Sequence, residues 1–179
     1  MIRDYLALRG ESPDLLPVLE AGGESAESAV LPIATEFRAK LPKAAIEATL
    51  ATPRLQLDEL RTVSAKFVPD GFKAAKIRMP DDYLKLYTLK MDDWKEAVTE
   101  PEPEGSLRRQ LGRRAPAWMV CGENPMVTEE RDAEGVYLRV AGSDAFDLPF
   151  TLLYVPVPAF DGETLTISKA AYLALMHNT

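Results

Sequence analysis

The feature that most constrains this chain is a change in the spacing of its apolar residues near residue 64. In residues 25–52 the apolar side chains recur three or four positions apart, as on one face of a helix. From Ser64 onward they alternate with polar side chains, as in strands with one buried face. Helix formers return at Ser168–Met176. The sequence therefore predicts an α+β protein with its helices at the two ends and its strands between them.

The N-terminal helical region carries one apolar stripe that two prolines interrupt. Pro32 is expected in the first turn of a helix, and Pro42 is expected to end that helix. Residues 43–52 then form a second predicted helix, and Thr166 is the candidate N-cap of the last one. The stripe consists of Val30, Ile33, Ala34, Phe37 and Leu41, and the second helix has Ala45, Ile46, Thr49 and Leu50 on its inner face.

The strand-like part extends over residues 64–163. The predicted strands include Ala75–Met79, Tyr83–Met91, Trp118–Cys121, Met126–Arg131, Val136–Val140 and Phe150–Val155. Asp132-Ala133-Glu134-Gly135 predicts a hairpin turn, and residues 95–99 are expected to continue a strand beyond a bend at Asp92-Asp93. We expect a small helical bundle made of residues 1–63 and 164–179, with a mainly antiparallel β-rich insertion at 64–163.

Composition excludes several classes of protein. One cysteine, Cys121, allows no internal disulfide, and one histidine, His177, leaves too few ligands for a His/Cys metal site. The net charge of −7 argues against tight, charge-driven wrapping of nucleic acid. The apolar runs are too short to span a bilayer, and the first residues have no secretory pattern. The chain is expected to be made in a reducing compartment and to have no membrane partner.

Catalytic motifs are missing from the sequence. The chain has no phosphate-binding glycine loop and no Gly-x-Ser-x-Gly, and His177 lies too near the end to serve as a well-held general base. Two aspartate pairs, Asp81-Asp82 and Asp92-Asp93, suggest either a glycosidase or Ca²⁺ site, or turns. We interpret them as turns, because their spacing does not match a calcium loop. No catalytic residue, metal site or cofactor is predicted.

Two charged segments are candidates for an interface. Arg108, Arg109, Arg113 and Arg114 follow the acidic loop that holds Glu100, Glu102 and Glu104. The arginines could contact phosphate, pair with the acidic loop of a neighbouring copy, or form a solubilising surface; Ser106 could cap a brief helix here. Aromatic residues, Trp94 among them, are either core and interface anchors or a sugar-binding platform. The candidate interface residues are therefore Trp94, these three glutamates and these four arginines.

One stretch and several shorter motifs resemble a known family. Met79–Val98 reads M-P-D-D-Y-L-K-L-Y-T-L-K-M-D-D-W-K-E-A-V, Leu41–Pro53 reads L-P-K-A-A-I-E-A-T-L-A-T-P, and Leu153–Pro156 reads L-Y-V-P. These segments resemble, in the same order, those of the head–tail connector proteins of tailed phages, most closely those of crAss-like phages and prophages of gut Bacteroidales. Arg114-Ala115-Pro116 occupies the place of the family's Arg-Gly-Thr-Pro turn without its glycine and threonine.

The resemblance implies a virion structural protein without catalytic activity. It would form a homo-oligomeric ring below the portal during head completion, would be assembled in the bacterial cytoplasm, and would be a monomer in isolation. Its partners would be the portal protein and neighbouring tail or ring proteins, with DNA passing without sequence-specific contact. Two rival hypotheses remain: a β-sandwich module that recognises glycan or protein, and a carboxylate-dependent hydrolase.

Overall fold

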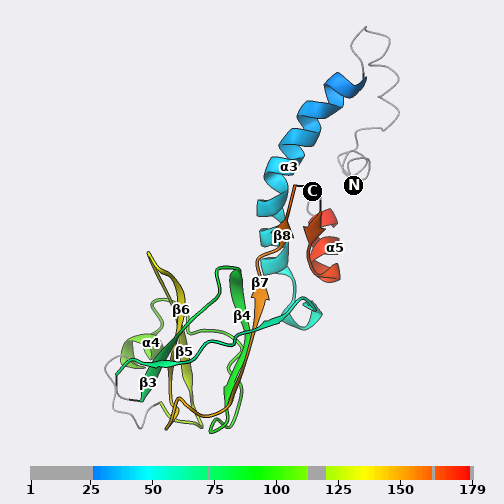
Figure 1. Cartoon of the computed structure of the whole chain (residues 1–179). Coiled ribbons are helices and arrows are strands. Elements are labelled where there is room, and N and C mark those ends of the chain that lie inside the picture. Colours follow the sequence, from blue (N-terminus) through cyan, green and yellow to red (C-terminus); the bar gives the residue numbers. More distant parts are fainter. Residues whose placement is uncertain (1–25, 72, 113–119, 163, 178–179) are drawn as a thin grey trace. The chain divides into compact units, whose positions relative to one another are not determined.

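The computed structural model describes residues 26–71, 73–112, 120–162 and 164–177, and it has an α+β architecture (Figure 1). The chain divides into two compact units. The helical unit comprises Met1–Glu59 and Pro158–Thr179, and the β unit comprises Leu60–Val157. No helix among the described residues combines the length and the apolar character that a membrane crossing requires.

The helical unit is built on one long helix, α3 (Ala26–Ala51), which runs through both Pro32 and Pro42. The expected break at Pro42 was therefore wrong. Proline in a helix interior removes one backbone hydrogen bond, but a buried stripe on both sides of it can keep the helix continuous. Here Leu41, Ala45 and Ala48 are buried on either side of Pro42. The threonines at the end of α3 are satisfied locally, since Thr52 Oγ1 donates to the Ala48 carbonyl at 2.7 Å.

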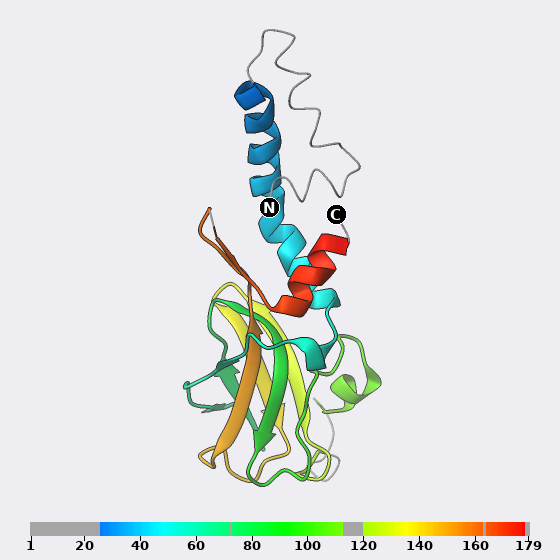
Figure 2. The same cartoon turned by 90° about the vertical axis from the view of Figure 1, so that its right-hand side faces the viewer.

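The second part of the helical unit is the chain's C-terminal segment. A two-stranded ribbon, β8 (Ala159–Phe160) with β9 (Leu165–Thr166), precedes helix α5 (Lys169–His177). Ser168, rather than the expected Thr166, caps α5, because its Oγ accepts from the Ala171 N–H at 3.2 Å. Leu41 and Ala48 of α3 form a small apolar cluster with Leu175 of α5, and both views show these two helices side by side (Figures 1 and 2).

A short connection leads from α3 into the β unit. The 3₁₀ turn η2 (Arg54–Gln56) belongs to the helical unit, and strand β1 (Arg61–Thr62) follows it. One antiparallel sheet has the order β1-β7-β4, with β4 at Tyr83–Met91 and β7 at Phe150–Pro156. The second has the order β2-β3-β6-β5 and contains β2 (Val68–Pro69), β3 (Ala74–Arg78), β5 (Met126–Asp132) and β6 (Gly135–Ala141).

The two sheets pack face to face around one apolar core. Each sheet directs one face inward, as Ala75 and Ile77 on β3 and Leu138 and Val140 on β6 illustrate with exposures of 0%. Side chains from both sheets belong to a single cluster, so the β unit is a two-layer sandwich. The cluster consists of Phe67, Ala75, Ile77, Met79, Tyr83, Leu86, Leu89, Met91, Trp94, Val127, Leu138, Val140, Leu152 and Tyr154.

The predicted hairpin between β5 and β6 is confirmed. Asp132 pairs with Gly135, and the Asp132 Oδ1 accepts from the Glu134 N–H at 2.8 Å and from the Gly135 N–H at 3.1 Å. Gly135 has φ +140°, a conformation that favours glycine. The local turn chemistry therefore fixes the register of the longest strand pair in this sheet.

Two expected strands differ from the structure. Residues 95–99 do not continue β4 but turn back against it, because the Val98 and Leu89 amides each donate to the other's carbonyl at 2.8 Å. Of the predicted strand Trp118–Cys121, residues 118 and 119 lie outside the described residues, and Val120–Cys121 form a bend.

Candidate functional site

The acidic loop and the arginine helix contact each other within the β unit. Helix α4 (Leu107–Gly112) follows the loop and carries Arg108, whose Nη1 donates to the Glu102 Oε1 at 2.6 Å. The same guanidinium also binds the two residues that precede strand β5. Its Nη2 donates to the Asn124 Oδ1 at 2.6 Å and to the Pro125 carbonyl at 2.9 Å. Glu102 and Arg108, predicted as complementary patches for a neighbour, are thus paired inside one chain.

The expected helix cap at Ser106 is confirmed, and it orients the second arginine. The Ser106 Oγ accepts from the Arg109 N–H at 3.1 Å. From this position the Arg109 Nη2 donates to the Glu129 carbonyl at 3.0 Å. Arg113 and Arg114 lie outside the described residues. The two described arginines of the predicted cluster therefore both bind backbone oxygen at or beside strand β5.

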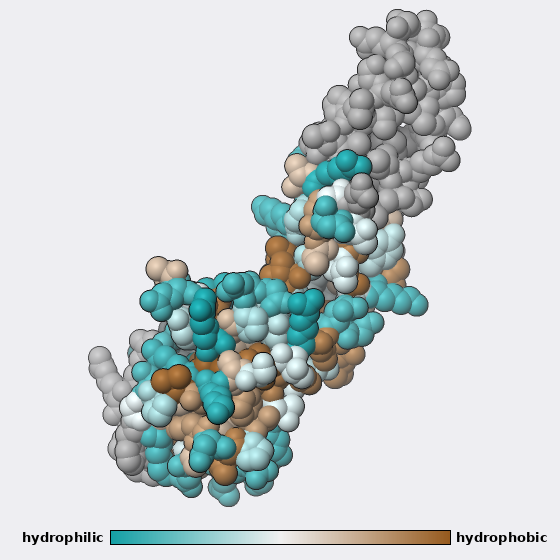
Figure 3. Space-filling view, viewed as in Figure 1, coloured by the Kyte–Doolittle hydropathy of each residue, from teal (hydrophilic) through white to brown (hydrophobic). Residues whose placement is uncertain are grey.

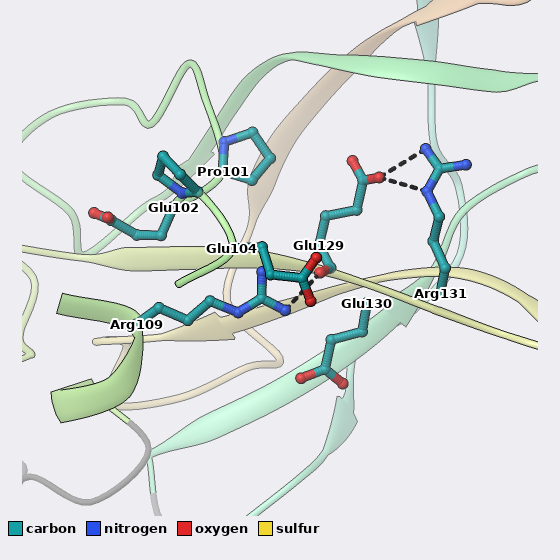
Figure 4. A pocket seen from close by; sticks show the side chains of 8 residues that line it. Pro101, Glu102, Glu104, Arg109, Glu129, Glu130 and Arg131 are labelled. Atoms are coloured by element: carbon teal, nitrogen blue, oxygen red, sulfur yellow. Dashed lines mark hydrogen bonds and ion pairs between the residues drawn. The ribbon is translucent and has the colours of Figure 1, made fainter. Parts of the chain in front are cut away.

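A charged groove of about 680 Å³ lies between the acidic loop and β5 (Figure 4). Acidic and basic side chains both line it, and Figure 4 shows that they come from the loop, from α4 and from β5. The lining residues are Pro101, Glu102, Pro103, Glu104, Arg109, Glu129, Glu130 and Arg131. Both signs of charge are present, and an ion pair joins Glu129 to Arg131, so the groove does not present a field of one sign.

Glu129 of the groove has two side-chain partners. Its Oε2 accepts from the Tyr83 hydroxyl at 2.9 Å, and its Oε1 accepts from the Arg131 Nε at 2.8 Å. Burial and the adjacent carboxylate raise the pKa of Tyr83, so this hydroxyl remains a donor at neutral pH. This contact was not predicted from the sequence. The available signal was the alternation of β5, which places Glu129 on the same side as buried Val127 and so requires a polar partner there.

The other predicted acidic residues differ in their surroundings. Glu130, on the opposite face of β5, pairs with Lys76 at 3.2 Å, and this hydrogen bond raises the pKa of Lys76. Burial lowers the pKa of Lys85, and the charge of the exposed Glu100 opposes part of this lowering. Glu104 is exposed at the rim of the groove. The acidic loop is therefore anchored through Glu102, whereas Glu100 and Glu104 face solvent.

Trp94, a candidate interface residue, lies in the core of the β unit. Its side chain is 2% exposed and belongs to the core cluster of the sandwich. The Asp92-Asp93 turn directs the chain back over the sheet, which places the indole inside the core rather than on the surface. Its Nε1 is buried without a hydrogen-bond partner. The structure therefore agrees with the interpretation of Trp94 as a core residue.

The two aspartate pairs form turns at opposite ends of β4. Asp82 pairs with Arg61 and accepts from the Tyr154 hydroxyl at 2.8 Å, whereas Asp93 accepts from the Ser143 hydroxyl at 3.0 Å. The nine residues of β4 separate the pairs by about 30 Å at roughly 3.3 Å per residue. These aspartates therefore do not converge on one pocket.

A second cavity, of about 580 Å³, is lined mainly by apolar and aromatic side chains. Phe67 packs edge-to-face on Phe150, with ring centroids 4.8 Å apart, and lies 6.0 Å from Phe146. Lys66, Asp144 and Asp147 contribute charge to its lining. Of these, Asp144 is already paired with Lys73 at 2.6 Å. The cavity thus has an aromatic wall and a polar margin, the arrangement of a small binding pocket.

Neither a metal-binding group nor a match to a known protein identifies the chemistry of the described residues. Among the described residues, no group of three or more His, Cys, Asp and Glu side chains is placed to hold a metal ion. No protein-family model matches the chain, and neither a curated protein nor a solved structure resembles it significantly.

Proposed function

We propose that this chain is a non-catalytic structural protein of a phage virion, a head–tail connector that assembles as a ring below the portal. The observation that carries the proposal is the likeness of Met79–Val98 to the connector proteins. This stretch forms the turn into β4, β4 itself and the return to Val98, so it is the framework of the sandwich. In this proposal the β unit is an insertion in a small bundle that α3 and α5 build.

The helical unit supports the proposal through its exposed apolar side chains. Leu50 is 51% exposed, Leu173 50% and Tyr172 38%, although all three belong to helices that also bury one face. Exposed leucine and tyrosine are typical of surfaces that a protein partner covers. The proposal assigns the contacts with the portal and with neighbouring copies to this unit.

The β unit supports a different role. Glu102 and Arg108 satisfy each other inside the chain, so the proposal no longer uses them for contacts between copies. Figure 3 shows, on the face that it presents, hydrophobic residues interspersed with hydrophilic ones. With a net charge of −7, the ring would repel DNA and let it pass through the channel. The β unit is proposed to face the next ring or the tail.

The test is co-expression of the full chain with the portal protein encoded beside its gene. The expected product is a portal–connector complex with a ring of this chain in electron micrographs. The Leu50→Glu, Leu173→Glu variant should lose that complex, because it places charge on the proposed contact surface. The matched control is Val68→Glu with Leu107→Glu, which alters residues of the β unit that are 65% and 70% exposed. The proposal fails if no complex forms, or if both variants behave alike.

The aromatic cavity favours a second candidate, a β-sandwich module that binds glycan or protein. Phe67, Phe146 and Phe150 offer the apolar wall that sugar rings or apolar side chains stack on. Calorimetric titration of monomeric protein with glycans and peptides tests it. Quenching of tryptophan fluorescence at Trp94 is not a suitable readout, because this indole is buried. A ligand whose affinity falls in Phe146→Ala would favour this candidate over the connector.

A further inference from the structure

Strand β5 is an edge strand of its sheet, and its outward carbonyls are covered by another part of the chain. In an antiparallel pair every second residue directs its N–H and C=O away from the partner strand. On this edge the Pro125 carbonyl accepts from Arg108 at 2.9 Å, the Val127 carbonyl from the Glu102 N–H at 2.7 Å, and the Glu129 carbonyl from Arg109 at 3.0 Å. Three successive outward acceptors are therefore occupied.

The covering segment, residues 98–110, is here named the edge strap. At its start it is tied to the opposite sheet, since Val98 and Leu89 exchange two backbone hydrogen bonds of 2.8 Å. In its middle, Glu102 donates its N–H to β5 while its carboxylate accepts from Arg108 at 2.6 Å. At its end, Ser106 caps α4 and so positions Arg109. The strap thus closes the side of the sandwich where both edges lie.

The composition of the edge strap suits it to cover a sheet edge without adding a further strand to the sheet. An ordinary added strand would satisfy β5 and present a new edge of its own. Here Pro101 and Pro103 flank Glu102 and have no N–H to offer, and two of the three donors are guanidinium groups. The strap covers the carbonyls of β5 without creating a further ladder.

We propose that the edge strap is a removable guard that prevents β5 from pairing with β5 of a second copy. The strand is complementary to itself: in an antiparallel pair centred on Glu130, Glu129 of one copy lies opposite Arg131 of the other, and two-fold symmetry makes this contact twice. Both residues have outward backbone groups in the β5–β6 register. Release of the strap opens this edge, and the inference does not depend on the connector proposal because no portal is involved.

The test uses the full chain with Arg108→Ala and Arg109→Ala, which remove two of the three covering donors. We expect the dimer dissociation constant to fall by roughly tenfold or more for each contact removed. Light scattering over a concentration series measures the change as a shift from monomer to dimer mass. The matched control, Arg61→Ala with Arg78→Ala, removes the same charge from exposed ion pairs of the β unit and should leave the mass unchanged.

A third substitution locates the contact. Arg131→Pro, added to the Arg108→Ala, Arg109→Ala variant, removes an outward N–H and the opposing charge but spares the pairing with β6. The mass should return to that of the unaltered chain. If the double variant folds poorly, the single change Arg109→Ala is a milder alternative. It should also lower the dimer dissociation constant. The inference is overturned if native-like strap variants keep the original mass, or if their dimer survives Arg131→Pro.

Discussion

The described residues of the two units differ in how completely they bury their apolar side chains. In the β unit, Ile77, Leu89 and Leu138 have no exposed surface. In the helical unit the cluster around Leu41 and Leu175 is small, and other leucines of the same helices remain about half exposed. Among the described residues, the β unit therefore has the larger buried core, and the helical unit leaves more of its large apolar side chains exposed.

The same contrast holds for polar groups. In the β unit Glu129 has both Tyr83 and Arg131 as partners, and the edge strap covers the outward carbonyls of β5. In the helical unit the described ion pair, Lys43 with Glu47, is highly exposed, and such pairs contribute only about 0.3–0.5 kcal/mol. The connector proposal accordingly assigns stability to the β unit and the contact with the portal to the helical unit.

The largest expected effect comes from a truncation in the sandwich core. Leu138→Ala removes a fully buried side chain and should lower the free energy of unfolding of the β unit by about 3–4 kcal/mol. Denaturant unfolding followed by hydrogen exchange measures it. Amides of β3 and β6 should lose protection while those of α3 and α5 keep theirs. Equal loss in both units would show that the chain unfolds as a single cooperative body and would break the comparison.

A smaller effect is expected from the matching truncation in the helical unit. Leu175→Ala removes a side chain that is 5% exposed and packs in a cluster of few residues. We expect a loss of about 2 kcal/mol, at the lower end of such truncations, because the small cluster can collapse around the gap. Hydrogen exchange should show the loss in α5 and in the second half of α3. A cost as large as that of Leu138→Ala would contradict the picture of a weak helical core.

Local patterns predicted the regular elements well. The prediction for β4 has the same bounds as the strand itself, Tyr83–Met91, because the segment is rich in β-formers and the flanking aspartate turns mark both of its ends. The Asp132–Gly135 hairpin was readable for the same reason, since its aspartate and glycine determine the turn locally. Features that depend on a few neighbouring residues were therefore visible in the sequence.

Features that depend on contacts between residues far apart in the chain could not be predicted from the sequence. Pro42 signals a break locally, but burial of the stripe on both sides of it overrides that signal. The charges of Glu102 and Arg108 were recognised as complementary, yet only the return of the chain from β4 to β5 shows that they pair within one chain. Glu129 was missed because its partner, Tyr83, is 46 residues away.

An intermediate effect is expected where the core meets the groove. Tyr83→Phe removes the hydroxyl that donates to Glu129 at 2.9 Å. Because the carboxylate keeps Arg131 as a partner, the loss should be about 1–2 kcal/mol rather than more. Denaturant unfolding measures it, with Tyr137→Phe as the control. The Tyr137 hydroxyl donates to the exposed Glu134 at 3.2 Å, so its removal should leave stability nearly unchanged.

The smallest effect at neutral pH is expected at Tyr154. Burial, then its hydrogen bond to Asp82, raises the pKa of Tyr154 to about 12, whereas the phenol of an unfolded chain titrates near about 10. The folded state therefore retains this proton at a pH where the unfolded state releases it. The contribution is complete below about pH 10, and it is lost as the pH rises toward the folded value of about 12.

Comparison of the unaltered chain with Tyr154→Phe isolates this contribution. At pH 7 the variant should be less stable by about 1 kcal/mol, the usual worth of one such hydrogen bond. Between about pH 10 and pH 11.5 the unaltered chain should lose stability faster than the variant, so the two curves should converge. Parallel curves would mean that the Tyr154 hydroxyl titrates alike in both states. The sandwich would then hold this tyrosine less tightly than its contact with Asp82 indicates, and the contrast between a self-contained β unit and an open helical unit would weaken.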